Sequence, residues 1–148
     1  MDFVVHSRED LIASIYAAQR HAGSFRGDAL LAAAEAAGRL AIDNGWLLIA
    51  ADSSGERIVG TATTVVECAL VDTSRRLDDV DVLVVAGMIA GPYGVLETAA
   101  RSRSMGARAV HCFYVGGWSG DLDGVDTVHR FADASIQATS NCVERQEA

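Results

Sequence analysis

Residues 80–115 read VDVLVVAGMIAGPYGVLETAARSRSMGARAVHCFYV. The runs at 80–86 and 108–115 are short and almost unbroken in apolar residues, which is typical of strands buried on both faces of a sheet. Between them, a helix is predicted to follow the glycine-bearing bend at 87–94 and to end at Gly106. A strand, a helix and a second strand in this order predict a parallel pair joined by a helical crossover.

The same alternation extends toward the N-terminus. An alanine-rich helix is predicted over 28–43, and the Asn44-Gly45 pair is expected to end it. Residues 46–51 (WLLIAA) form another apolar run and are predicted as a buried strand. Residues 64–71 combine helical spacing with β-branched side chains, so that either a helix or a strand is predicted there.

We therefore expect an α/β protein, namely a three-layer α-β-α sandwich with a mainly parallel sheet. The whole chain, 1–148, is expected to form a single domain. Its predicted parts are an N-terminal helix within 1–27, an α/β core over 28–131 that ends in an edge strand near 125–131, and a C-terminal helix or tail over 132–148.

The composition argues against several functions. The 148 residues carry a net charge of -8, and all 12 basic residues are arginine. A chain without lysine has no Schiff-base chemistry and no P-loop lysine, and the acidic balance argues against nucleic acid or a membrane as partner. The 3 cysteines form no CxxC motif. Together with the lack of a signal-peptide pattern, this predicts a reduced, cytoplasmic setting.

Ligands of parallel sheets bind at the carboxyl ends of the strands, here near 51–56, 86–94 and 115–121. The first of these bends reads DSSG at 52–55. It predicts either an anion site at a helix N-terminus or an ordinary turn whose polar side chains cap the helix. The charge of Asp52 favours the capped turn, because it would repel a phosphate.

The other two bends are rich in glycine. Residues 87–94 (GMIAGPYG) lack the GxGxxG spacing of a dinucleotide site and the acidic residues of a phosphoribosyltransferase loop. Their glycines still allow a ligand to approach the backbone. Residues 116–120 (GGWSG) predict either a pocket wall formed by Trp118 or a loop whose tryptophan packs on another subunit.

Two side chains are candidates for proton transfer. Glu67 lies in a mostly apolar stretch, and a buried carboxylate has a raised pKa that suits a general base, although a solvent-facing glutamate is the alternative. His111 is the second candidate. It precedes Cys112, but strand alternation places the two on opposite faces, so no metal site is expected. The GxSxG pattern of a nucleophile elbow does not occur.

Residues 77–117 (LDDVDVLVVAGMIAGPYGVLETAARSRSMGARAVHCFYVGG) resemble the central strand–loop–helix–strand unit of the sugar isomerase (SIS) domain family. VLETAA at 95–100 and GARAV at 106–110 carry the likeness most clearly. Residues 29–64 (ALLAAAEAAGRLAIDNGWLLIAADSSGERIVGTATT) are similar to the first unit of that family. Phosphoheptose isomerases are the members that the segment order resembles most.

The resemblance implies a SIS-like, flavodoxin-like fold, a phosphosugar ligand, no cofactor and assembly into a homodimer or homotetramer. It implies aldose–ketose isomerisation with Glu67 as the base and either His111 or a histidine of a partner subunit as the acid. The ligand-binding residues that it implies are Asp52, Ser53, Ser54, Gly55, Gly87, Ile89, Ala90, Gly91 and Tyr93.

Two functions follow, together with a third interpretation. Family members hold the phosphate with serine and threonine hydroxyls, and this chain has Gly87, Ile89 and Pro92 at those positions of the second bend. This difference favours a binding or regulatory module without turnover, and an active sugar-phosphate isomerase is the alternative. An unrelated α/β domain with the same segment order is the third interpretation.

Overall fold

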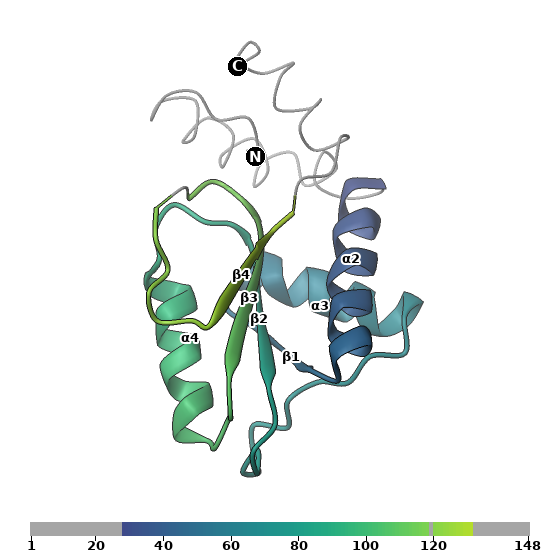
Figure 1. Cartoon of the computed structure of the whole chain (residues 1–148). Helices are drawn as coiled ribbons and strands as arrows, with labels where there is room; N and C mark the ends of the chain where they lie inside the picture. The colour runs from purple at the N-terminus through teal and green to yellow at the C-terminus, as the bar shows by residue number, and fades with distance from the viewer. Residues whose placement is uncertain (1–27, 119, 132–148) are drawn as a thin grey trace.

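The computed structural model describes residues 28–118 and 120–131 (Figure 1). The N-terminal helix expected within 1–27 and the C-terminal helix or tail expected over 132–148 lie outside these residues. The elements in chain order are α2 (Asp28–Asn44), β1 (Leu47–Ala50), α3 (Ser53–Val65), β2 (Val82–Met88), α4 (Tyr93–Ser104), β3 (Val110–Gly116) and β4 (Thr127–Arg130). None of the helices in the described part of the chain is long and apolar enough to cross a membrane.

The four strands form one parallel sheet in the order β1-β2-β3-β4. The register pairs Ile49 with Val84, Val84 with Cys112, and Cys112 with Val128. The predicted α/β fold with a parallel sheet is therefore confirmed.

A single bridge extends the sheet beyond β1. Leu48 pairs in parallel with Leu70, because the Leu48 N–H donates to the Ala69 carbonyl and the Val71 N–H donates to the Leu48 carbonyl. The chain thus passes from β1 outward to Leu70 and returns to β2 on the other side of β1. The direction of the strand order reverses between β1 and β2, and parallel sheets bind ligands at such a reversal.

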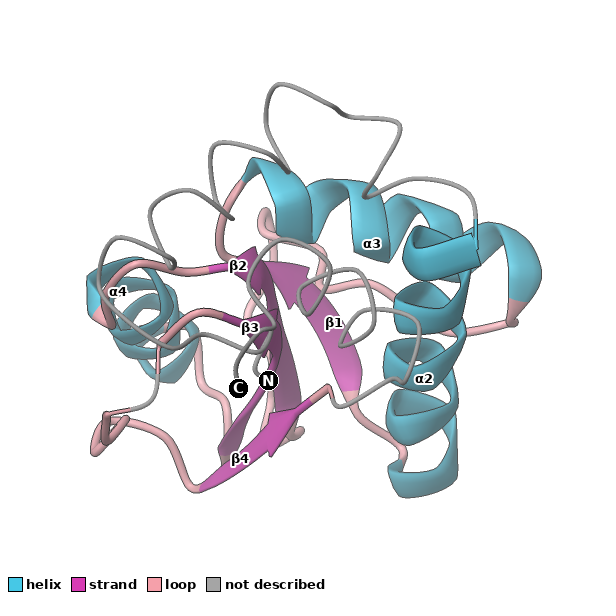
Figure 2. Ribbon diagram, turned by 90° about the horizontal axis from the view of Figure 1, so that it is seen from above, coloured by secondary structure: helices cyan, strands magenta, loops and turns pink. Residues whose placement is uncertain are grey.

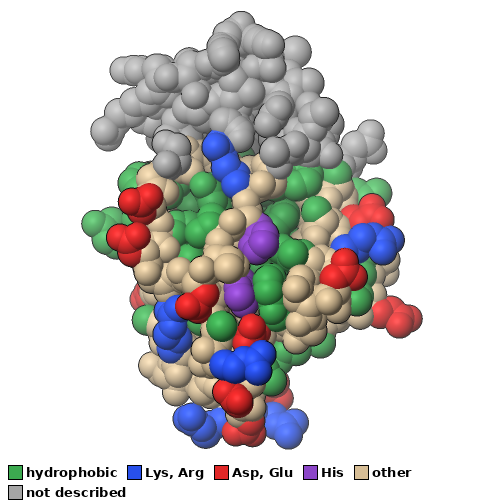
Figure 3. Space-filling model, viewed as in Figure 1, with side chains coloured by type: hydrophobic (Ala, Val, Ile, Leu, Met, Phe, Trp, Pro, Cys, Tyr) green, Lys and Arg blue, Asp and Glu red, His purple; other side chains and the backbone are tan. Residues whose placement is uncertain are grey.

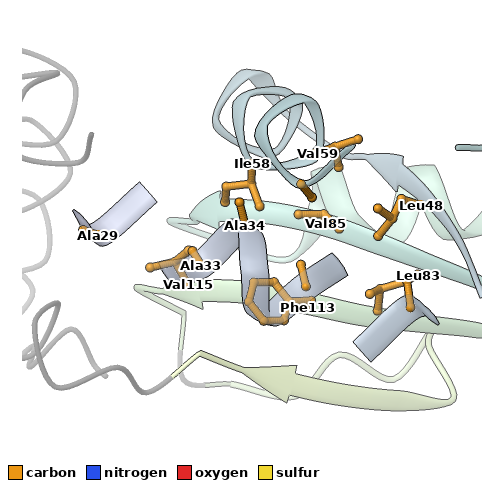
Figure 4. Packing of buried hydrophobic residues seen from close by; sticks show 13 residues of the cluster. Ala29, Ala33, Ala34, Leu48, Ile58, Val59, Leu83, Val85, Phe113 and Val115 are labelled. Carbon is orange, nitrogen blue, oxygen red and sulfur yellow. The ribbon is translucent and has the colours of Figure 1, made fainter. Parts of the chain in front are cut away.

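Helices cover both faces of the sheet (Figure 2). Along β2, the alternate side chains Leu83 and Val85 pack on the face that carries α2 and α3, and Val82 and Val84 pack on the face that carries α4. Figure 4 shows the first of these cores, in which Ile58 of α3 lies near Val85. The buried alanines of α2 allow this helix to approach its neighbours closely; they are Ala29, Ala33, Ala34, Ala37 and Ala41.

Several predicted boundaries hold, and one ambiguity is settled. Gly45 at φ +71° follows α2 and Gly106 at φ +106° follows α4, which confirms both predicted helix ends. The ambiguous stretch 64–71 continues α3 to Val65 and then becomes extended. The hydroxyls of Thr63 and Thr64 donate to the Gly60 carbonyl, so these β-branched residues fit within the helix.

Candidate functional site

The carboxyl ends of β1 and β2 enclose a small hollow. Its volume is about 210 Å³, and it opens to solvent at the point where the strand order reverses. The hollow is lined by Ala51, Asp52, Met88, Ile89, Ala90, Gly91, Gly94 and Val95. The bends at 52–55 and 87–94 therefore share one crevice, which we call the β1–β2 crevice.

Two glycines outside the lining of the hollow allow the two bends to approach each other. A Cβ atom on Gly87 would lie 2.3 Å from the Cβ of Ser54, and a Cβ atom on Gly55 would lie 2.1 Å from the Val85 carbonyl oxygen. Only residues without a side chain permit this approach. Gly55 and Gly87 thus set the spacing between the bends.

Among the described residues that line the crevice, Asp52 is the charged one. It is the N-cap of α3, and its carboxylate accepts a hydrogen bond from the Gly55 N–H. Burial raises the pKa of the Asp52 carboxyl, backbone hydrogen bonds from Gly55 and Gly87 act against this rise, and the charge of Glu56 adds to it. The N-terminus of α3 already holds an anion of the chain itself, so the bend is the capped turn that the sequence allowed.

The N-terminus of α4 borders the same crevice and has no side-chain cap. Pro92 is the N-cap residue, it provides no side-chain hydrogen bond, and the first turn contains no acidic residue. A first turn leaves its backbone N–H groups without partners inside the helix. The crevice therefore combines a carboxylate on one rim with backbone donors on the other.

The structure divides the predicted ligand residues into two groups. Asp52, Ile89, Ala90 and Gly91 line the hollow. The residues that do not line it are Ser53, Ser54, Gly55, Gly87 and Tyr93. Tyr93 is 82% exposed, so its ring faces solvent instead of the crevice.

Glu67 lies far from the crevice. It is exposed and follows the C-terminal end of α3, whereas the crevice borders the N-terminal end of that helix. The 13 residues of α3 span about 20 Å. The expectation of a buried base beside the ligand is thus corrected, because Glu67 lies beyond the end of α3 and its side chain faces solvent.

His111 lies near the amino-terminal ends of the strands, opposite the end that carries the crevice. It is the second residue of β3, about 16 Å along the strand from Gly116. It is 7% exposed, and its ring stacks on Trp46 with centroids 3.7 Å apart. The structure does not bring His111 and Glu67 together, so the expected acid–base pair is not present at the crevice.

Trp118 does not line the β1–β2 crevice. Its indole N–H donates to the Asp121 carbonyl at 3.3 Å, and its own carbonyl accepts from the Tyr114 hydroxyl at 2.6 Å. A Cβ atom on Gly120 would lie 2.6 Å from the Trp118 ring. The indole therefore packs under its own loop, which needs glycine at this position.

Sequence reasoning missed a polar cluster around His111. Asp81 precedes β2 and Thr127 begins β4, and both lie within hydrogen-bond distance of this ring, while His129 contacts the Thr127 hydroxyl. The two described histidines appear on one face in Figure 3. No sequence motif marks the cluster, because its members are brought together by the pairing of His111 with Thr127 in the sheet register.

Comparison with protein-family models, curated proteins and solved structures finds no match to this chain. The fold and the hollow described above define it as a parallel α/β protein with a crevice at the carboxyl ends of its strands.

The capping role of Asp52 has a measurable consequence. Replacing Asp52 with alanine is expected to lower the free energy of unfolding by about 1 kcal/mol, whereas asparagine should retain most of the stability because it caps equally well. Urea denaturation of both variants checks this. Ser53→Ala, at the exposed next position, is the matched control, and an equal loss in that variant would contradict the assignment of Asp52 as the cap.

Proposed function

We propose that this protein is a SIS-like binding or regulatory module that holds a small sugar, phosphosugar or related polyol in the β1–β2 crevice. The observation that carries the proposal is a hollow of about 210 Å³ at the reversal of the strand order, with a carboxylate and a helix N-terminus on its rims. Ligand pockets for larger molecules span roughly 300–1,000 Å³, so this hollow suits a ligand no larger than a monosaccharide.

The chemistry of the two rims suits a polyol. The Asp52 carboxylate can accept hydrogen bonds from sugar hydroxyls, since each of its oxygens has more than one lone pair. A phosphate group, where present, would lie at the N-terminus of α4, where the backbone donors and the helix dipole favour negative charge. The charge of Asp52 would keep the phosphate away from the N-terminus of α3.

Isomerisation is the weaker alternative. A general base must come within hydrogen-bond reach of the proton that it removes. Glu67 and His111 both lie away from the crevice. The proposal therefore assigns ligand binding to the crevice and assigns no isomerisation of the bound ligand to Glu67 or His111.

Self-association remains part of the proposal. The resemblance implies a homodimer or homotetramer formed through helices. Helix α2 exposes two large apolar side chains, Leu31 at 45% and Ile42 at 44%, which a second copy of the chain could cover.

Thermal unfolding with glucose phosphate, glucose and inorganic phosphate tests the ligand. A compound at 100 times its dissociation constant should stabilise the folded state by about 2.7 kcal/mol. Glucose phosphate is expected to give the largest shift, glucose a smaller one, and phosphate alone the smallest. The absence of a shift with all three compounds would contradict the proposal.

Gly94→Leu tests the place of binding. A Cβ atom on Gly94 would lie 3.8 Å from the Ala51 carbonyl oxygen, so a leucine there fits the helix and extends into the hollow. The variant is expected to fold and to lose the ligand shift. Gly60→Leu is the matched control on α3, because a Cβ atom there meets nothing within 4 Å. A ligand shift that survives in Gly94→Leu would place the binding site elsewhere.

A further inference from the structure

The polar cluster at the amino-terminal ends of the strands forms a continuous series of hydrogen bonds. The Asp81 carboxylate lies 3.1 Å from His111 Nε2, and His111 Nδ1 lies 2.6 Å from the Thr127 hydroxyl. The same hydroxyl lies 3.1 Å from His129 Nε2. A carboxylate, an imidazole and a hydroxyl thus follow one another within hydrogen-bond distance.

The positions of the protons in this series of hydrogen bonds follow from which groups can donate and which can accept. An ionised carboxylate only accepts, so His111 carries its proton on Nε2 and offers the lone pair of Nδ1 to the hydroxyl. The Thr127 hydroxyl has one proton, which it donates to Nδ1. His129 must then donate from its Nε2–H to the Thr127 oxygen, which retains a second lone pair.

The Asp81 carboxylate, which begins this series of hydrogen bonds, is held in its charged form. Partial burial of Asp81 opposes ionisation, but the hydrogen bonds from His111 and Arg108, the latter at 2.8 Å, hold the pKa of Asp81 below its usual value. An ionised, oriented carboxylate of this kind fixes the tautomer of the imidazole and stabilises the imidazolium when it forms.

We propose that Asp81, His111 and Thr127 form an acyl-transfer site, in which the Thr127 hydroxyl is the nucleophile and the substrate is an ester of a small carboxylic acid. A nucleophile in contact with a base, which is in turn oriented by a third group, is the arrangement that activates a hydroxyl. This inference does not depend on the β1–β2 crevice, which lies at the other end of the strands.

Burial and packing suit each group to its role. Asp81 and His111 are only 13% and 9% exposed as side chains, and Trp46 stacks on the imidazole, so the base is held in place. Thr127 is exposed at the edge of the sheet, where a substrate can reach it. Among the described residues no three acidic, histidine or cysteine side chains are placed to hold a metal ion, so metal ligation does not account for the cluster.

His129 provides a donor for the oxygen that becomes charged. Burial, and after it the neighbouring His111, lowers the pKa of His129, so its ring is neutral near pH 7. With the protons assigned as above, His129 Nε2 donates to the Thr127 oxygen, which lies 3.1 Å away, and it can reach the carbonyl oxygen of an ester whose carbon bonds to that atom. Such a fixed donor stabilises the tetrahedral intermediate.

The reaction is balanced without any further reagent except water. The Thr127 oxygen bonds to the ester carbonyl carbon while its proton moves to His111 Nδ1. The bond to the leaving alcohol then breaks, and the alcohol takes that proton. Water attacks the acyl-threonine through the same base, which releases the carboxylic acid and restores Thr127.

The full chain incubated with p-nitrophenyl acetate tests this proposal. Release of nitrophenol is followed by absorbance, and transfer of an acetyl group is followed by intact and peptide mass spectrometry. Acetylation is expected at Thr127. Thr127→Val should slow nitrophenol release by at least about 100-fold, the usual contribution of an acid–base step, while Thr127→Ser should retain it.

Two further variants separate this role from a structural one. Thr63→Val, an equivalent change at an exposed threonine of α3, should leave the rate unchanged. Asp81→Asn should slow acetyl transfer by about 100-fold, because the amide no longer fixes the imidazole tautomer. Nitrophenol release that persists in folded Thr127→Val, or acetyl groups found only on other residues, would overturn the proposal. Circular dichroism verifies the fold of each variant.

Discussion

Replacing Gly55 with alanine is expected to destabilise the protein by about 3 kcal/mol, the upper range for adding a methyl group to a packed site. The new Cβ would lie 2.1 Å from the Val85 carbonyl oxygen, which is closer than any real contact. That oxygen accepts a hydrogen bond from the Ala51 N–H at 2.8 Å, so β2 cannot move away without breaking its link to the end of β1. Relief of the clash would therefore move the start of α3 away from β2.

Gly60 provides the matched control within the same helix. A Cβ atom there meets nothing within 4 Å and the position is exposed, so Gly60→Ala should raise the free energy of unfolding by roughly 0.5–1 kcal/mol through helix propensity. Urea denaturation followed by circular dichroism measures both variants. If the two alanines changed stability alike, the close approach of α3 to β2 would be wrong.

Replacing Leu83 with alanine is the second large effect. Leu83 is fully buried in the middle of the sheet, where β2 lies between β1 and β3 and beneath α2 and α3. The loss of its side chain removes buried apolar surface and leaves a cavity that the strands cannot close. We expect a decrease of about 3 kcal/mol in the free energy of unfolding.

Leu70→Ala, in the extended segment after α3, is the control for this change. The Leu70 side chain is 49% exposed, so the same deletion should cost less than about 1 kcal/mol. Chemical denaturation followed by circular dichroism and by tryptophan fluorescence measures both variants. A loss at Leu70 as large as the loss at Leu83 would mean that the assigned core is incorrect.

Much of the architecture was predictable from local patterns. The apolar runs at 80–86 and 108–115 became β2 and β3, because residues buried on both faces of a parallel sheet need no polar alternation. The helix ends at Gly45 and Gly106 and the capped bend at 52–55 could also be predicted. Positive φ angles and helix caps depend on only a few neighbouring residues.

The candidate sites were less predictable. Glu67 seemed suited to catalysis because its neighbours in the sequence are apolar, yet its exposure depends on where α3 ends and on what packs beyond that end. The bond between His111 and Thr127 joins residues 16 positions apart. It exists only because β3 and β4 pair in one register.

Short-range preferences along this chain were enough to specify which segments are helices, which are strands, and that parallel strands end in two glycine- and serine-bearing bends. The packing of distant segments determined the rest: the width of the crevice and the alignment of Asp81, His111 and Thr127. Local preferences act over a few residues, whereas distances between side chains on different strands are set by sheet register and by the close packing of the whole core.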